Sequence, residues 1–240
     1  MNNIFDRIKY GTETIKDPLK KNEFSYGKII ASGNECNKCG ACERVCTIDA
    51  IKINTSENGV NIVSVDNKKC IYCRNCVDIC PKSVLEMTSD YKMAELEFEG
   101  EQLKKKIYNT FKRSLVLRVI DTGSCNACMS ELSALQNTFY DISRFGINVA
   151  ASPRHADGLV VTGIVTKNMK EALEKTYHAI AEPKIVIAVG SCAYGGGMFK
   201  EGEGVYDVLK NILPVDLVIP GCPPSPQAII FGLLKLMDKI

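Results

Sequence analysis

The sequence is short of several features that would assign it to a common class of protein. It has no tryptophan, only two histidines, and a formal net charge of +2 over 240 residues. Without a basic excess, it is not expected to bind nucleic acid. No apolar run approaches the ~18 residues of a membrane-spanning helix, and the start Met1–Tyr10 is too polar for a signal peptide. These absences predict a cytoplasmic protein that meets a membrane only through partner subunits.

Cysteine is the residue in clear excess, with twelve copies in the chain. A reducing cytoplasm disfavours disulfides. His155 and His178 are too few to complete many mixed cysteine–histidine zinc sites. Twelve thiols divide into three sets of four, which is the ligand count of three iron–sulfur clusters or of three all-cysteine zinc sites.

Eight of the cysteines form two copies of one motif, Cys-x2-Cys-x2-Cys-x3-Cys, over Cys36–Cys46 and Cys70–Cys80. Such a loop can wrap three thiolates around three corners of a cubane, and in two-cluster ferredoxins the fourth thiolate comes from the other motif. Zinc ribbons use separate Cys-x2-Cys pairs, so zinc is the weaker interpretation. The expected ligand sets are Cys36, Cys39, Cys42 and Cys80 for cluster 1, and Cys70, Cys73, Cys76 and Cys46 for cluster 2.

The chain changes character near residue 113. A charged stretch precedes this point, and in it Leu103, Ile107 and Phe111 recur every four residues, as on one face of a helix. The expected organisation is a lead-in segment over residues 1–30, an α+β two-cluster ferredoxin domain over 31–90, a helical linker over 91–112 and an α/β domain over 113–240.

In the second half, apolar runs that favour strands alternate with helical patterns. Alternation of this kind indicates right-handed β–α–β crossovers and a buried parallel sheet with helices on both faces. The expected strands are 115–120, 159–162, 185–189 and 215–219, and the expected helices are 130–140, 167–181 and 225–239.

The remaining four cysteines are spread over this α/β half, each following the carboxyl end of an expected strand. The carboxyl ends of parallel strands share one edge of the sheet, where open α/β proteins bind ligands. Nearby glycines would let the backbone approach a bulky group. Taken singly, Cys192 and Cys222 could be ordinary buried thiols. Taken together, the four predict a third cluster held by Cys125, Cys128, Cys192 and Cys222.

The cysteine motifs and several short motifs of the α/β half resemble those of known families. The N-terminal half resembles the two-[4Fe–4S] ferredoxins and the ferredoxin-like subunits of complex I and of membrane-bound hydrogenases. The second half resembles the small subunit of the group-four, energy-converting nickel–iron hydrogenases of the Ech and formate hydrogenlyase type, and the homologous subunit of complex I. The carrying motifs are Cys125-Asn-Ala-Cys128, Arg144-Phe-Gly-Ile147, Ser152-Pro-Arg-His-Ala-Asp157, Gly190-Ser-Cys192 and Ile219-Pro-Gly-Cys-Pro-Pro224.

The resemblance implies that the ferredoxin domain is followed by a flavodoxin-like α/β domain, and that the chain relays single electrons through three [4Fe–4S] clusters. A soluble donor, such as reduced ferredoxin or a formate dehydrogenase module, would supply the electrons. A separate large subunit with a nickel–iron site would receive them from the third, proximal cluster and reversibly reduce protons to H2. Membrane subunits would hold the complex, with this chain on the cytoplasmic face. No nickel–iron site is expected on this chain, because its Cys-x2-Cys motifs are committed to clusters.

Two further features of the α/β half have both a functional and a structural interpretation. Glu131 matches an acidic position near the proximal cluster, which implies proton handling, although the helix dipole also favours an acid there. The loop with Arg154, His155 and Asp157 is implied to face the large subunit near the cluster, and a structural hydrogen-bonding role is the alternative.

Several other functions remain open. A complex-I-like quinone oxidoreductase is the leading alternative, but complex I subunits place the first two ligands adjacent, whereas Cys125-x2-Cys128 is the hydrogenase form. A zinc assembly module and a ferredoxin with an inert α/β appendage are weaker, since the latter gives four cysteines no role. The glycine run 195–197 lacks the context of a nucleotide-binding loop.

Overall fold

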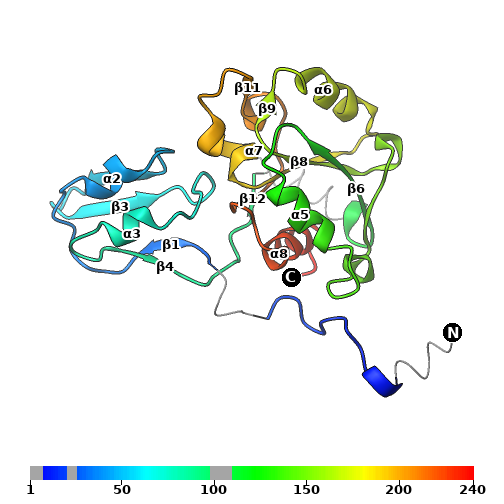
Figure 1. Cartoon of the computed structure of the whole chain (residues 1–240), viewed down its shortest axis with the longest axis horizontal. Coiled ribbons are helices and arrows are strands. Elements are labelled where there is room, and N and C mark those ends of the chain that lie inside the picture. Colours follow the sequence, from blue (N-terminus) through cyan, green and yellow to red (C-terminus); the bar gives the residue numbers. More distant parts are fainter. Residues whose placement is uncertain (1–7, 21–25, 98–109) are drawn as a thin grey trace.

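The computed structural model describes residues 8–20, 26–97 and 110–240, and the chain forms a small and a large lobe (Figure 1). The elements of the small lobe are β1 (Ile29–Ala31), α2 (Ala41–Val45), β2 (Ile51–Thr55), β3 (Asn61–Val65), α3 (Asn75–Asp78) and β4 (Leu85–Met87). β1 pairs antiparallel with β4, and β2 with β3. Their inward residues form one core together with buried cysteines, among them Cys42, Cys70 and Cys76. This is the α+β dicluster arrangement expected from the motifs.

Two described parts of the helical linker expected over 91–112 differ from each other, since one is a strand and the other is helical. Glu95–Leu96 forms strand β5, which pairs antiparallel with β12 (Leu217–Ile219). The expectation of a helix was wrong for Glu95 and Leu96. Strand pairing at the edge of a sheet produces no regular repeat of apolar residues, so no pattern in the sequence indicated it. Phe111 is helical and buried, while Leu103 and Ile107 lie outside the described residues.

The large lobe is built on a six-stranded sheet in the order β5-β12-β10-β8-β6-β7. All neighbours are parallel except β5 and β12. Without β5, the parallel strands follow the flavodoxin-like order 2-1-3-4-5 in chain order. The strands are β6 (Leu115–Asp121), β7 (Ile147–Val149), β8 (Gly158–Thr162), β10 (Ile185–Val189) and β12, and β9 (Val165–Thr166) pairs separately with β11 (Val205–Asp207).

Helices cover both faces of this sheet (Figure 1). Val160 and Ile187 pack in the core that contains α5 (Ala127–Ala134) and α8 (Pro226–Leu236). Their strand neighbours point the other way, into the core that contains α6 (Lys170–Ala179) and α7 (Ser191–Gly195). Every residue of β8 and β10 is buried, as a strand covered on both faces requires. Short 3-10 helices lie at Ile142–Phe145, Pro153–His155, Gly197–Phe199 and Leu209–Asn211.

The expected elements of this half are found, with shifted ends. β10 matches its expected range, whereas β12 begins two residues later than expected. α5 begins at Ala127 instead of residue 130, because Asn126 just before it has a left-handed φ of 70° and so cannot belong to the helix. It ends at Ala134, earlier than residue 140. The lead-in packs on the large lobe: the Ile15 N–H donates to the Phe139 carbonyl at 2.9 Å.

Candidate iron–sulfur sites

The two motif loops of the small lobe follow the same backbone path. Lys38 and Tyr72 occupy equivalent positions, and each has a φ of 56°. This turn directs the Lys38 N–H to the Sγ of Cys36 at 3.4 Å and the Tyr72 N–H to the Sγ of Cys70 at 3.3 Å. The first sulfur of each motif therefore accepts a main-chain hydrogen bond, as the sulfurs around a cluster do.

The last cysteine of each motif repeats the pattern. The Ala50 N–H donates to the Sγ of Cys46 at 3.3 Å, and the Val84 N–H donates to the Sγ of Cys80 at 3.4 Å. Both donors lie four residues after their cysteine. Equivalent N–H groups at both ends of both motifs indicate two sites built on one plan, and hydrogen bonds to sulfur are a means of tuning a cluster's potential.

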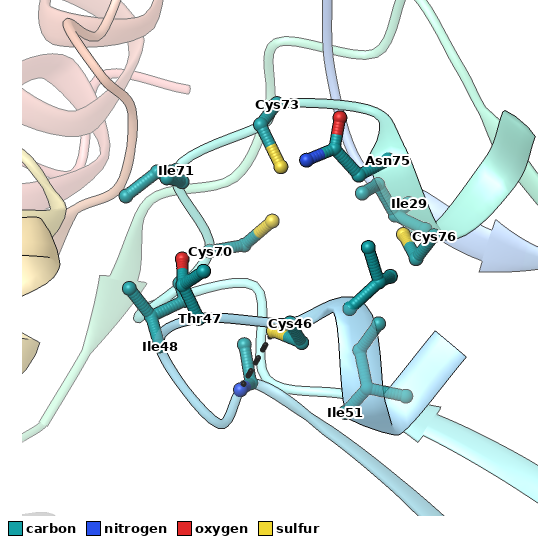
Figure 2. A pocket seen from close by; sticks show the side chains of 12 residues that line it. Ile29, Cys46, Thr47, Ile48, Ile51, Cys70, Ile71, Cys73, Asn75 and Cys76 are labelled. Atoms are coloured by element: carbon teal, nitrogen blue, oxygen red, sulfur yellow. Dashed lines mark hydrogen bonds between the residues drawn. The ribbon is translucent and has the colours of Figure 1, made fainter. Parts of the chain in front are cut away.

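The fourth cysteine of the first motif lies with the second motif. Figure 2 shows the sulfurs of Cys46, Cys70, Cys73 and Cys76 pointing into one cavity that these residues line with apolar neighbours. Burial, and then the charges of the other three thiols, raise the pKa of Cys70 to about 12. We call this group the second site, and it has the composition of the crossed ligand set.

The reciprocal group is formed in the same way. Burial raises the pKa of Cys42, and the charges of Cys80 and Cys36 raise it further, so these thiols are neighbours. Cys39 belongs to the same loop and is exposed. We call Cys36, Cys39, Cys42 and Cys80 the first site.

The cysteines of the large lobe converge at the carboxyl edge of the sheet. Burial, and then the charges of Cys192, Cys222 and Cys125, raise the pKa of Cys128 to about 12. Burial likewise raises the pKa of Cys192 to about 11. Cys125 and Cys222 are the exposed members. We call this group the third site.

Two glycines make room at the third site. A Cβ on Gly190 would lie 2.5 Å from the Sγ of Cys128, and one on Gly197 would lie 2.6 Å from the Sγ of Cys192. Both have positive φ, so the chain needs glycine there for its conformation as well. The backbone therefore approaches the sulfurs as closely as it can, which fits a cradle for a bulky group.

The loop before Cys125 is held by one carboxylate. Asp121, at the end of β6, accepts hydrogen bonds from the N–H of Gly123 at 2.9 Å, from the N–H of Ser124 at 2.8 Å and from the Ser124 hydroxyl at 2.8 Å. A Cβ on Gly163 would lie 2.4 Å from the Ser124 nitrogen, so the loops after β6 and β8 are in contact. This contact lies at the point where the strand order reverses, the usual ligand site of such a sheet.

The three sites follow one another through the molecule. The charge of Cys42 in the first site contributes to the raised pKa of Cys76 in the second, after burial and closer thiols. The charge of Cys73 in the second site contributes in the same way to the raised pKa of Cys222 in the third. The second site therefore lies between the other two.

The sulfur groups differ from a site for one metal ion. In the described ranges, no three His, Cys, Asp or Glu side chains are grouped as a single metal ion would require. Four thiolates around one zinc ion, each at about 2.3 Å, crowd together. A cubane binds one thiolate at each iron corner and so holds its ligands further apart. The cavity, the N–H groups directed at sulfur and the two cradle glycines fit the larger group.

The other residues singled out from the sequence have different outcomes. Glu131 is half-buried in α5, burial raises its pKa, and its charge contributes to the raised pKa of Tyr140. Arg154, His155 and Asp157 precede the amino end of β8, whereas the cysteines of the third site follow carboxyl ends of strands. The Asp157 carboxylate accepts a hydrogen bond from the Val116 N–H at 2.7 Å, which is the structural role expected as the alternative. That the loop faces the large subunit stays a prediction.

Two residues near the sulfur groups were missed from the sequence. The Ser191 hydroxyl donates to the carbonyl of Cys70, and the Tyr26 hydroxyl donates to the carbonyl of Pro223. The position of Ser191 inside Gly190-Ser-Cys192 was a signal, but Tyr26 lies in no motif.

No helix within the described ranges combines the length and hydropathy that a membrane crossing needs.

Comparison with known families divides the chain at the same place as the structure. Residues 35–84 match the 4Fe-4S dicluster domain, and residues 125–236 match the NADH ubiquinone oxidoreductase 20 Kd subunit. The first match covers both cysteine motifs of the small lobe. The second covers the α/β fold from Cys125 to the end of α8, including all four cysteines of the third site.

Individual relatives align mainly with part of the chain. A probable membrane-bound hydrogenase subunit of Pyrococcus furiosus is 41% identical, over 59% of this chain and 87% of its own length. Formate hydrogenlyase subunit 7 of Escherichia coli is 40% identical, over 64% of this chain and 58% of its own. An NADH-quinone oxidoreductase subunit of Bacteroides thetaiotaomicron is 37% identical, over 65% of this chain and 90% of its own.

These relatives are subunits of oxidoreductase complexes, and this chain aligns with 87% of the length of the Pyrococcus furiosus subunit at 41% identity. The dicluster match adds iron–sulfur clusters in the small lobe. The chain therefore belongs to the family of the NADH–ubiquinone oxidoreductase 20 kDa subunit, as an electron-transfer iron–sulfur subunit of the hydrogenase and complex I-like complexes, with a dicluster ferredoxin domain ahead of it.

Proposed function

We propose that this chain binds three [4Fe–4S] clusters and relays single electrons between a soluble donor and the nickel–iron large subunit of a hydrogenase, which reversibly reduces protons to H2. When bound, such clusters take up and release electrons one at a time. The proposed ligands are those of the three sites: Cys36, Cys39, Cys42 and Cys80; Cys46, Cys70, Cys73 and Cys76; and Cys125, Cys128, Cys192 and Cys222.

The observation that carries the proposal is the succession of the three sulfur groups. Thiols of both motifs and of the large lobe have thiol neighbours within their own site, and the second site also has neighbours in both of the others. A chain that only stored electrons would need no such succession. A chain that relays them needs redox groups close to one another between an entry and an exit.

The protein's own contribution is position and environment. Main-chain N–H groups at both ends of each small-lobe motif stabilise negative charge on sulfur. Burial of Cys70, Cys76 and Cys128 keeps water from the inner sulfurs. Both hydrogen bonding to sulfur and solvent exclusion shift a cluster's potential, so the chain can order the potentials along the relay.

Each of the three sites has an exposed cysteine, and we assign the first and third as the ends of the relay because the second has neighbours in both. Cys39 is the exposed member of the first site, which suits electron entry from ferredoxin or a formate dehydrogenase module. Cys125 and Cys222 are exposed at the third site, where we expect the large subunit to cover them. The complex would be completed by membrane subunits, with this chain on the cytoplasmic face; that one relative is a probable subunit of a membrane-bound hydrogenase supports a membrane-bound complex.

A second candidate acceptor is a quinone. It is favoured by the 37% identity to the NADH-quinone oxidoreductase subunit of Bacteroides thetaiotaomicron. The spacing Cys125-x2-Cys128 favours the hydrogenase instead, because complex I subunits place these two ligands next to each other. The relay through the chain would be the same for both acceptors.

Metal analysis tests the cluster count. Protein purified without oxygen should contain about 12 iron and about 12 acid-labile sulfide per chain, as three cubanes require. Zinc in place of iron would contradict the proposal. An iron content of about eight per chain, together with alkylation of Cys125 and Cys128, would also contradict the proposal.

The intact complex tests the acceptor. H2 should reduce the third site first and the other two afterwards, as followed by rapid-freeze EPR, while the isolated chain should not turn over H2. Cys192→Ala should stop reduction of the first and second sites by H2. If H2 reduces nothing and a quinol does, the quinone reductase is the correct assignment.

A further inference from the structure

A buried hydroxyl joins the second site to the third. Ser191 is the first residue of α7, and it is 1% exposed. Its Oγ donates to the carbonyl oxygen of Cys70 at 2.6 Å, across 121 residues of sequence. Cys70 belongs to the second site, and Cys192, the residue after Ser191, belongs to the third. The two cysteines are thus connected by one hydrogen bond and otherwise by covalent bonds.

The same hydroxyl also contacts the other strand end of the third site. The Gly221 N–H donates to the Ser191 Oγ at 3.3 Å, and the Gly221 carbonyl lies 3.2 Å from it. A hydroxyl carries one hydrogen, and the shorter distance directs it to Cys70. Gly221 precedes Cys222, so Ser191 touches the main chain beside ligand positions in both sites.

A second tie runs in the opposite direction, from the small lobe to the large one. The hydroxyl of Tyr26 donates to the carbonyl of Pro223, the residue after Cys222. The Tyr26 ring packs on Tyr72, with ring centroids 5.3 Å apart, and the Tyr72 N–H donates to the Sγ of Cys70. Tyr26 therefore fills space between the two sites with an aromatic ring.

The main chain of the lobes is also close beside these ties. A Cβ on Gly195, at the end of α7, would lie 2.8 Å from the Cγ of Lys69. The ammonium of Lys68 lies 5.2 Å from the centroid of the Tyr194 ring and 2.8 Å from a carboxylate oxygen of Glu97. The segment before Cys70 is thus packed against α7 along its length.

We propose that Ser191 is a positioning residue for electron transfer between the second and third sites, which holds the Cys70 loop against α7 and supplies a hydrogen-bonded route between them. The inference rests on the proposed three-cluster relay. One electron leaves the group at the second site and enters the group at the third, and no bond forms or breaks. Electron tunnelling weakens steeply with distance and is weaker across a gap than through bonds, so loss of this contact should slow this step specifically.

The test compares Ser191→Ala with Ser130→Ala in the full chain with its clusters. Ser130 is also a serine near a third-site cysteine, Cys128, but it is exposed, and its hydroxyl bonds to Asn126 within its own helix. We expect both variants to keep the wild-type iron content. In Ser191→Ala, the EPR spin–spin interaction between the reduced second and third sites should weaken, and electron transfer between them after flash reduction should slow.

Hydrogen exchange supplies a readout that needs no electron transfer. A buried hydrogen bond is worth about 1 kcal/mol, so amides at the contact of Cys70 with α7 should exchange about fivefold faster in Ser191→Ala. Ser130→Ala should leave them unchanged. Identical spin coupling, transfer rate and exchange in the two variants would overturn the inference.

A milder variant covers the case in which Ser191→Ala loses its clusters. Ser191→Cys keeps a side chain of the same shape but donates a weaker hydrogen bond to the Cys70 carbonyl, and it should also weaken the spin coupling. Unchanged coupling in Ser191→Cys would then overturn the inference. If the wild-type chain lacks three clusters, the proposed function itself has failed, which the iron count reveals before any variant is made.

Discussion

A Cβ atom on Gly190 would lie 2.5 Å from the Sγ of Cys128, closer than a Cβ can approach sulfur. Gly190 lies between β10 and α7 with a φ of 89° and a ψ of 151°, a conformation that other residues adopt only with strain. The end of one strand is therefore packed against a cysteine that follows another. This contact places Cys128 beside the turn that leads to Cys192.

Gly190→Ala should remove the third cluster and leave the other two. The added methyl group displaces Cys128 or the β10–α7 turn, and either movement separates the ligands. Iron should fall from about 12 to about 8 per chain. Gly204→Ala is the control, because no atom lies within 4 Å of its Cβ position and its φ is not positive. Full iron content in Gly190→Ala would show that the close contact does not matter.

Cys46→Ala should damage the cluster held by the second motif, not the one beside it in sequence. Cys46 lines the cavity with Cys70, Cys73 and Cys76. EPR of the reduced variant should therefore retain the signal of the first site. The reciprocal variant Cys80→Ala should retain the signal of the second. Loss of the opposite signal in either variant would mean that the ligands do not cross.

Cys222→Ala should abolish the third cluster and spare both clusters of the small lobe. Its thiol neighbours Cys125, and the second site lies beside it. Because a metal site contributes to folding, docking of the partner subunit should weaken as well. Iron analysis and EPR measure the first effect, and co-purification of the large subunit measures the second. A variant that keeps three clusters would remove Cys222 from the site.

Asp216→Asn should change how the stability of the chain depends on pH. Burial raises the pKa of Asp216 from 3.8 to about 6, and its carboxylate accepts a hydrogen bond from the Val186 N–H at 2.7 Å. The folded chain then holds a proton that the unfolded chain releases at lower pH. This group's contribution to stability is present below about pH 4 and is lost as the pH rises through about 6.

Asparagine keeps an oxygen acceptor and does not ionise. The free energy of unfolding of Asp216→Asn should therefore rise relative to wild type between about pH 4 and pH 7, by on the order of 2 kcal/mol. Thermal unfolding of both proteins at several pH values measures it. A constant difference across this range would mean that Asp216 is ionised throughout in the folded chain.

Local patterns in the sequence were enough for the class of each lobe. The spacing within Cys36–Cys46 and Cys70–Cys80 acts over a single turn, so it determines that the first three thiols of each motif can share a site. The apolar runs that became β8 and β10 are hydrophobic throughout because both of their faces are covered. Such features are set by neighbours in the chain, and they can be read without a structure.

The tertiary structure alone decided how the lobes meet. The pairing of β5 with β12, the packing of the lead-in on the large lobe and the hydrogen bond from Ser191 to Cys70 join residues more than 100 positions apart. Main-chain pairing and single hydrogen bonds require no regular repeat of residue types, so no pattern in the sequence predicts them. The position of the second site between the other two is a consequence of these contacts, because only packing brings Cys73 to Cys222.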